Sequence, residues 1–213
     1  MAFYPINLNV KNQRCLVIGG GQVAKRKVET LLSYQARVEI IAPFTEIVSE
    51  LFYLIRNNRI LHLASEYQSS LLQGVFLVFC ATDSEQLNQR IASDAHSLGI
   101  LVNVVDDPQF CTFTVPAVMH RGELTVSVST GGNSPALARA LRDKMEHEYG
   151  TEWSSLLNFL GQVRKYLLKN CSDPVKRRKV LSCLGQPEAV YFYQNNEGKE
   201  FEEIVWSLIK YQE

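Results

Sequence analysis

The chain has 213 residues, of which 46% are hydrophobic and 21% are charged, and its 22 basic residues balance 22 acidic ones. This length and composition are typical of one large or two small globular domains with a substantial core. A formal net charge of zero argues against a general nucleic-acid-binding protein, which needs a basic excess to contact phosphates. No apolar run approaches the roughly 20 residues that span a bilayer, so we expect no membrane segment.

The first residues and the cysteines indicate a compartment. The start, Met-Ala-Phe-Tyr-Pro-Ile-Asn-Leu, lacks the charged and apolar regions of a signal peptide. The five cysteines are odd in number, widely spaced and without a C-x-x-C pair, which argues against a disulfide framework and a zinc site. No two of the four histidines have the spacing of metal ligands, so we predict no metal site. A cytoplasmic protein fits this pattern.

The first half of the chain alternates between short apolar runs and helical periodicity. Buried strands are expected at residues 15–18, 37–42, 60–64, 75–81 and 100–105. Helices are expected between them, at residues 22–33 and 45–57, and from a cap at residue 83 or 84 to residue 96. Strands that alternate with helices in this way predict an α/β protein, with a parallel sheet covered by helices on both faces.

The pattern changes after residue 108. Two extended runs, residues 113–119 and 123–130, flank a glycine and predict a β-hairpin with one polar face. Ser134 and Pro135 then have the order of a helix cap followed by a first-turn proline. From there to the end the chain is predicted to be mostly helical, with an apolar stripe from residue 153 to residue 167. The hairpin and the stripe both expose apolar surface that needs a partner, so we expect a homodimer.

A glycine-rich loop follows the first predicted strand. Residues 19–24, Gly-Gly-Gly-Gln-Val-Ala, fit the G-x-G-x-x-A pattern between a strand and a helix, where the pattern is a dinucleotide-binding fingerprint. Gly19 permits the tight turn, Gly21 leaves room for a pyrophosphate, and Ala24 lets the helix lie close to the strand. The helix N-terminus then offers free N–H groups to the phosphates. The alternative is a glycine turn that binds nothing.

The residue that reads the ribose of the cofactor is not evident. NAD sites usually have an acidic residue after the second strand, but this chain has Ala42, Pro43 and Phe44 there, and Glu39 comes too early. No arginine follows to hold a 2′-phosphate, which favours NAD over NADP. Thr82, at the end of the strongest strand, faces the cofactor in one interpretation and only starts a helix in the other.

Two further segments have candidate chemistry. Asp106 and Asp107 follow a strand at the same sheet edge and suit either acid–base work or a simple turn. Residues 131–135, Gly-Gly-Asn-Ser-Pro, lead into a helix that has Arg139 and Arg142, which suits a ligand with carboxylates. The alternative for this second segment is an ordinary capped helix with solvated arginines.

Taken together, these segments resemble the precorrin-2 dehydrogenase/sirohydrochlorin ferrochelatase family, the N-terminal module of sirohaem synthase that also occurs as a free-standing protein. The resemblance runs in order over about residues 3–146, and the later segments are not general features of dinucleotide-binding folds. The matching residues are Gly19, Gly20, Gly21, Val23, Ala24, Arg26 and Lys27; Ala81, Thr82, Asp83 and Asn88; Asn103, Val104, Val105 and Asp106; and Ser129, Thr130, Gly131, Gly132, Ser134, Pro135, Leu137, Ala138 and Arg139.

The resemblance implies an activity and a domain plan. Members of the family oxidise precorrin-2 to sirohydrochlorin with NAD, and some also insert ferrous iron. The implied fold is a Rossmann domain at residues 1–112, a dimerisation segment of hairpin and helix at residues 113–150, and a helical C-terminal domain at residues 151–213. No methyltransferase module follows these parts, so we expect the preceding methylation step in another protein.

The resemblance also assigns residues, which join those proposed from the pattern. Asp106 matches the catalytic aspartate of the family, and Thr130 stands where some members have a serine. The predicted cofactor-binding residues are Gly19, Gly21, Gln22, Val23, Ala24, Pro43, Phe44 and Thr82. The predicted residues for the polycarboxylate substrate are Arg121, Thr130, Gly131, Gly132, Ser134, Arg139 and Arg142.

A dinucleotide fingerprint also occurs in proteins with two other functions. Another nicotinamide-dependent reductase on the same fold would usually have a Tyr-x-x-x-Lys pair, which this sequence lacks. A non-catalytic NAD-sensing domain needs no substrate loop, and residues 131–135 argue against it.

Overall fold

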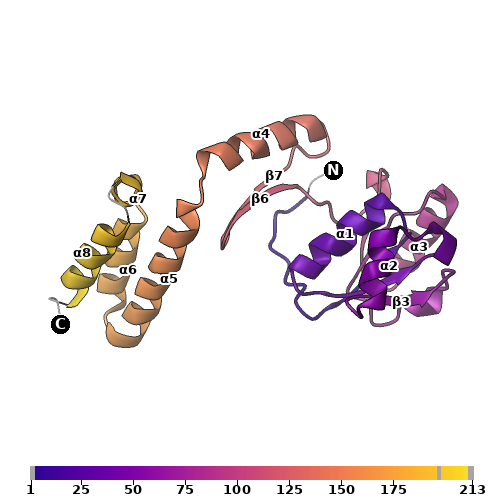
Figure 1. Cartoon of the computed structure of the whole chain (residues 1–213), viewed down its shortest axis with the longest axis horizontal. Coiled ribbons are helices and arrows are strands. Elements are labelled where there is room, and N and C mark those ends of the chain that lie inside the picture. The colour runs from indigo at the N-terminus through magenta and orange to yellow at the C-terminus, as the bar shows by residue number, and fades with distance from the viewer. Residues whose placement is uncertain (1–2, 196–197, 211–213) are drawn as a thin grey trace. The chain divides into compact units, whose positions relative to one another are not determined.

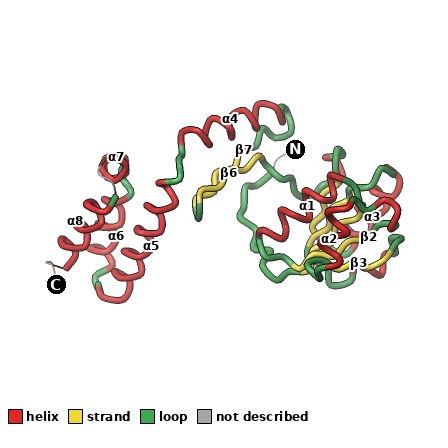
Figure 2. Tube along the Cα trace, in the orientation of Figure 1, coloured by secondary structure: helices red, strands yellow, loops and turns green. Residues whose placement is uncertain are grey.

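The computed structural model describes residues 3–195 and 198–210, and the chain separates into two compact units between Val115 and Pro116 (Figure 1). Figure 2 shows that the strands of the first unit lie among helices, whereas the second unit has one hairpin followed by helices only.

The first unit contains a five-stranded parallel sheet. Its strands are β1 (Arg14–Ile18), β2 (Arg37–Ile41), β3 (Leu61–Ala64), β4 (Leu77–Cys80) and β5 (Leu101–Val104), in the order β3-β2-β1-β4-β5. All neighbouring strands are parallel, and β1 lies at the centre, between β2 and β4. The central strands are continuous apolar runs because both of their faces are covered. The predicted parallel sheet is therefore confirmed.

Helices cover both faces of this sheet, each through its own apolar cluster. The helices α1 (Gln22–Ser33) and α2 (Ser49–Arg56) pack on one face, where Val17, Ile40 and Phe79 belong to the first core cluster. The helix α3 (Glu85–Ser97) packs on the opposite face. Side chains of one strand point alternately to the two faces, so adjacent residues of β1 enter different clusters.

The helix predicted at residues 45–57 begins later than expected, and this prediction was wrong at its start. The structure has a short 3₁₀ turn, η1 (Phe44–Glu46), and then α2 from Ser49. Ile47 between them is extended and buried, and the Val48 N–H donates to the carbonyl of Gly20 at 3.0 Å. This bond ties the segment to the glycine loop, a long-range contact that overrides the local helical spacing.

The outer edge of β5 is covered by the chain that follows it. After the 3₁₀ turn η3 (Pro108–Phe110), the N–H of Thr112 donates to the carbonyl of Val102 at 2.9 Å, and the N–H of Val102 donates to the Thr112 hydroxyl at 2.8 Å. The Asn103 amide donates to the carbonyl of Phe113 at 3.0 Å. These bonds satisfy groups that an open edge would leave unpaired. A further 3₁₀ turn, η2 (Ser69–Leu72), precedes β4.

The second unit begins with the predicted hairpin. The strands β6 (Ala117–Arg121) and β7 (Leu124–Val128) pair antiparallel, with Arg121 opposite Leu124. The helix α4 (Pro135–Glu148) follows and packs on both strands. As predicted, Ser134 caps this helix, because its hydroxyl accepts from the N–H of Leu137 at 3.2 Å.

Four helices complete the described chain: α5 (Glu152–Asn170), α6 (Pro174–Leu184), α7 (Pro187–Asn195) and α8 (Lys199–Lys210). The predicted apolar stripe of α5 is the centre of their core, with Leu156, Phe159, Val163 and Leu167 buried. Within residues 3–195 and 198–210, no helix is both long and apolar enough to span a membrane.

Candidate functional site

The three glycines after β1 are needed for different reasons. Gly19 has φ +123°, and a Cβ there would collide with the carbonyl oxygen of Ala81 at the end of β4. A Cβ on Gly20 would lie 2.7 Å from the carbonyl oxygen of Glu46. A Cβ on Gly21 would meet nothing within 4 Å. Packing of the chain itself therefore explains Gly19 and Gly20, whereas the open space at Gly21 suits a group from outside the chain.

The open space at Gly21 adjoins a helix end that has free donors. Gly21 is the N-cap of α1, no side chain caps this end, and its first turn contains no acidic residue. The first N–H groups of a helix lack partners within the helix and attract anions. Ala24 is fully buried, as the predicted close approach of α1 to the sheet requires. The residues present therefore fit the pyrophosphate of a dinucleotide.

A cleft of about 520 Å³ lies beside this helix end, at the carboxyl edge of the sheet. Its lining residues come from α1 and from the segments after β4 and β5, and include Val23, Thr82, Asp83, Asn88 and Asp106. The strand order reverses direction between β1 and β4, and open α/β sheets bind ligands at such a point. The structure thus brings Val23, Thr82 and Asp106 together in one cleft.

A buried asparagine fixes the segment after β4. The Thr82 hydroxyl donates to Oδ1 of Asn88 at 2.8 Å, and Nδ2 of Asn88 donates to the carbonyl of Thr82 at 2.9 Å. Asn88 is only 6% exposed, so these bonds are shielded from water. Ser84, rather than Asp83, caps α3, which leaves the Asp83 side chain at the cleft.

The segment after β2 presents an aromatic surface. Phe44 is 54% exposed, and its ring packs against His62, with 4.2 Å between ring centroids, and against Phe52. Nε2 of His62 is hydrogen-bonded to the carbonyl of Ala42 at 2.8 Å. Glu39 lies inside the sheet and pairs with Arg14, at 2.9 Å from Nε. No carboxylate of β2 therefore reaches its carboxyl end, in agreement with the sequence.

Asp106 lies exposed on the turn after β5. Its backbone has φ +60°, the left-handed region that L-residues rarely adopt and that Asp and Asn tolerate best. The ammonium of Lys27, on α1, lies 4.9 Å from the centroid of the Phe79 ring. Burial lowers the pKa of Lys27, as does Arg26, whereas Cys111 and Asp106 act in the opposite direction. The sequence predicts no separate role for Lys27, although its position, a cation on a mostly apolar helix face, is a signal that the sequence contains.

The predicted substrate loop has two glycines in the left-handed region of the backbone. Gly131 and Gly132 have φ +61° and +87°, with open space around both Cβ positions. The Thr130 hydroxyl accepts from the N–H of Ser134 at 3.1 Å, which closes the loop in front of α4. Arg139 is exposed on the first turns of α4.

Two of the predicted arginines have partners within the second unit. The guanidinium of Arg121 donates to the carbonyls of Tyr149, His120 and Glu146 at 2.9–3.0 Å and pairs with the Glu146 carboxylate. It therefore joins the hairpin to the end of α4. Arg142 pairs with Asp143 at 2.7 Å, and its buried Nε has no hydrogen-bond partner among the described residues.

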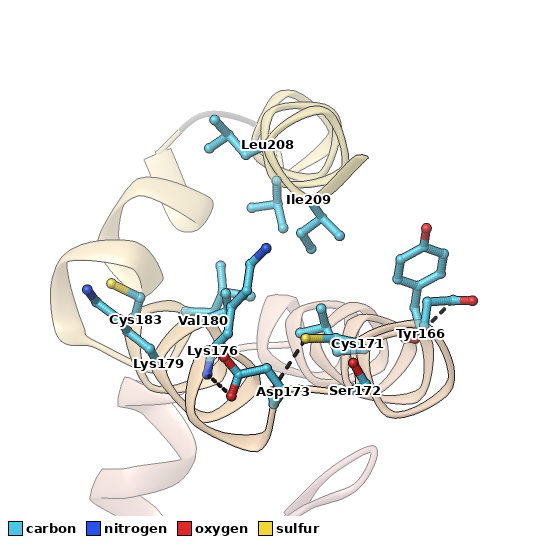
Figure 3. Close-up of a pocket in the computed structure, with 14 residues that line it drawn as sticks. Tyr166, Cys171, Ser172, Asp173, Lys176, Lys179, Val180, Cys183, Leu208 and Ile209 are labelled. Carbon is cyan, nitrogen blue, oxygen red and sulfur yellow. Dashed lines mark hydrogen bonds between the residues drawn. The ribbon is translucent and has the colours of Figure 1, made fainter. Parts of the chain in front are cut away.

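A larger cavity, of about 790 Å³, lies between α5, α6 and α8 (Figure 3). Its lining is mostly apolar, and Figure 3 shows Lys176 reaching from α6 towards Ile209 on α8. None of the predicted site residues lines this cavity. Size alone would select it, but the smaller cleft contains the glycine loop and Asp106, and we assign the site there.

The sheet order, the glycine loop and the cleft at the point of strand reversal define a Rossmann-type dinucleotide-binding protein. Residues 6–117, more than half of the chain, match the family model described as "Putative NAD(P)-binding", and the chain belongs to this family. Residues 121–148 match the model described as "Sirohaem biosynthesis protein central". A nicotinamide cofactor follows from the family, whose description covers both NAD and NADP.

Curated relatives and a solved structure agree with the predicted resemblance, which is confirmed. The siroheme synthase of Chromobacterium violaceum is 38% identical over 179 residues, which are 84% of this chain and 38% of that protein. The siroheme synthase of Methylobacillus flagellatus is 37% identical, with the same coverage. The chain thus spans little more than a third of these relatives. The structure titled "SirC, precorrin-2 dehydrogenase" has a TM-score of 0.78 and 20% identity, covers 96% of this chain and is itself covered completely, which confirms the fold.

Proposed function

We propose that the chain oxidises precorrin-2 to sirohydrochlorin in sirohaem biosynthesis, with NAD as the hydride acceptor. The observation that carries the proposal is that the uncapped end of α1, with open space at Gly21, and the Asp106 turn border one cleft. The names of the similar proteins, siroheme synthase and precorrin-2 dehydrogenase, point to the same reaction.

The roles of the residues follow from their positions. The N–H groups at Gly21, Gln22 and Val23 would hold the pyrophosphate, and Pro43 and Phe44 would contact the adenosine. When bound, the nicotinamide supplies a two-electron oxidant that takes a hydride. The Asp106 carboxylate takes the proton that leaves the substrate at the same time, as a general base. Thr82, held by Asn88, forms part of the cleft wall.

NAD fits the segment after β2 better than NADP. A 2′-phosphate is usually held by an arginine near this point. Residues 42–48, Ala-Pro-Phe-Thr-Glu-Ile-Val, contain no basic side chain and one acidic one. Calorimetric titrations with NAD⁺ and NADP⁺ compare the two affinities directly, and tighter binding of NADP⁺ would contradict this choice.

The polycarboxylate substrate needs cationic and N–H donors, which the second unit offers. We assign substrate contacts to the Thr130–Ser134 loop and to Arg139, whose side chain is exposed. Arg142 contributes the exposed part of its guanidinium, and Arg121 acts through the hairpin that it holds. Residues 1–112, 113–150 and 151–213 then serve as cofactor, dimerisation and helical domains. Ferrous iron insertion would release protons to the same carboxylate. The five cysteines, all free thiols, suit a cytoplasmic enzyme.

The experiment is an absorbance assay of the purified chain with enzymatically made precorrin-2 and NAD⁺. We expect conversion to sirohydrochlorin that depends on both the chain and the nucleotide. NAD⁺ binding is measured on the same sample, because binding without turnover identifies a non-catalytic sensor. A chain that binds NAD⁺ but leaves precorrin-2 unchanged would refute the proposed activity.

A further inference from the structure

The thiol of Cys111 lies inside the turn that carries Asp106. The backbone N–H of Val104 donates to Sγ at 3.1 Å, and the side-chain amide of Asn103 approaches the same sulfur at 3.6 Å. The S–H faces two carbonyl oxygens, those of Val104 at 3.3 Å and Asp107 at 3.4 Å. One side chain therefore links the end of β5 to the far side of the turn.

One backbone bond ties the turn to the neighbouring strand, from the N–H of Val105 to the carbonyl of Cys80 at 3.0 Å, but it lies before Asp106. The turn's own backbone closure, from the N–H of Asp107 to the carbonyl of Val104, is long at 3.4 Å. Asp106 between them keeps a left-handed conformation, with φ +60°. Such a conformation persists only where the surrounding structure enforces it. The bond of Val105 holds the first part of the turn, and the contacts of Cys111 hold its far side, at Asp107.

Cys111 is itself fixed in place. Its N–H donates to the carbonyl of Pro108 at 3.1 Å, and the next residue, Thr112, makes two bonds to Val102 along the edge of β5. Phe113 then packs edge-on against Phe79, with 5.4 Å between ring centroids. The sulfur is thus presented from a segment that is anchored to the sheet by the two residues that follow it.

The protonation state suits this role. Burial raises the pKa of the Cys111 thiol, and the Asp107 charge adds to this, whereas the Val104 N–H and Lys27 oppose it. A thiol with a raised pKa keeps its proton at neutral pH and can donate it to a carbonyl. The sulfur accepts and donates at once, which a purely apolar side chain of this size cannot do.

We propose that Cys111 is a positioning residue of the site: its thiol holds the Val104–Asp107 turn so that the Asp106 carboxylate stays at the cleft. The proposal rests on the proposed function for its kinetic consequence, and on the hydrogen bonds alone for its structural one. Cys111 touches neither cofactor nor substrate in this role, and its effect on rate passes through Asp106.

The test compares Cys111→Ala, Cys111→Ser and Cys183→Ala, the last being a matched control at an exposed cysteine of α6. Serine can accept from Val104 and donate to either carbonyl, whereas alanine can do neither. We measure hydrogen–deuterium exchange of the peptide spanning residues 102–113, NAD⁺ affinity, and kcat with precorrin-2. Small displacements of a catalytic group reduce rates by up to about 10²-fold.

We expect Cys111→Ala to exchange faster at the turn, and to lose about tenfold or more in kcat while its NAD⁺ affinity stays within about twofold. Cys111→Ser should restore most of the slow exchange at the turn and most of kcat, and Cys183→Ala should match the wild type. Unchanged exchange in Cys111→Ala would overturn the proposal whatever the reaction, and so would faster exchange with unchanged kcat. A wild-type chain without turnover would refute the proposed function instead, and the exchange would still decide whether the thiol holds the turn.

Discussion

At the scale of single residues, Asp106 lines the cleft and is the proposed general base. Asp106 is exposed at the cleft, on a left-handed backbone that Asp and Asn adopt at a lower cost than most other residue types. Asparagine shares this lower cost, so Asp106→Asn should keep the turn and lose only the ability to accept a proton at neutral pH.

We therefore expect Asp106→Asn to fold and bind NAD⁺ but to lose dehydrogenase rate by roughly 10² or more, the range of a lost general base. Asp107→Asn is the matched control, and it should cost far less, because Asp107 contributes mainly its backbone to the turn. The measurement is the initial rate with precorrin-2. Turnover near that of the wild type in Asp106→Asn would mean that the proton leaves by another route.

Lys27 gives a second prediction at this scale, about stability. Burial lowers its pKa, so the folded state disfavours the charged ammonium. The charged ammonium therefore destabilises the folded protein below the folded-state pKa of Lys27. This destabilisation disappears as the pH rises towards the pKa of lysine in the unfolded chain. Lys27→Met keeps a long apolar side chain, and we expect a higher Tm than the wild type at pH 7, with a difference that closes as the pH approaches the ordinary pKa of lysine.

Lys25, two residues earlier on α1, is the matched control. Its ammonium donates to Glu50 on α2 at 2.7 Å, and this bond is the main reason that its pKa is raised. Lys25→Met should therefore not raise the Tm at pH 7. Thermal unfolding between pH 7 and pH 10 measures both variants, and a lower Tm for Lys27→Met at pH 7 would contradict the cost assigned to the buried charge.

At the scale of elements, the sequence predicted what depends on local patterns. The five parallel strands were visible as short apolar runs, and their helices as periodic ones. The glycine loop was visible because strand, turn and helix follow one another along the chain. The start of α2 was missed because Ile47 and Val48 fit helical spacing, yet Val48 bonds to Gly20, far away in sequence. The proposed role of Cys111 is also not predictable from the sequence, because it depends on contacts across the turn that no local pattern shows.

The N-terminus of α1 gives the prediction for this scale. Gly21→Asp places a carboxylate in the open space where the pyrophosphate should lie. A Cβ there meets no atom of the chain, so the fold should be kept while NAD⁺ binding is lost. Calorimetry measures the affinity, and thermal unfolding checks the fold. Gly21→Ala is the control without charge and should retain more affinity, whereas unchanged binding in Gly21→Asp would remove the assignment of the phosphate site.

At the scale of the whole molecule, the second unit leaves apolar surface uncovered. The hairpin has only two strands, which are rarely stable by themselves in water. On α4, Leu137 and Leu141 are one helical turn apart and are 52% and 39% exposed. Neighbouring apolar side chains that stay exposed in a single chain are typical of a surface between subunits.

We therefore expect the chain to form a homodimer through the hairpin and its following helices, with twice the 24.2 kDa mass of one chain. Leu137→Glu should convert the dimer to a monomer without unfolding it, because this side chain is already exposed in the single chain. Leu61→Glu, at a comparably exposed leucine of β3 in the first unit, should leave the dimer intact. Light scattering at micromolar concentration measures the mass of all three proteins, and a wild-type particle of the single-chain mass would show that the exposed leucines serve another purpose.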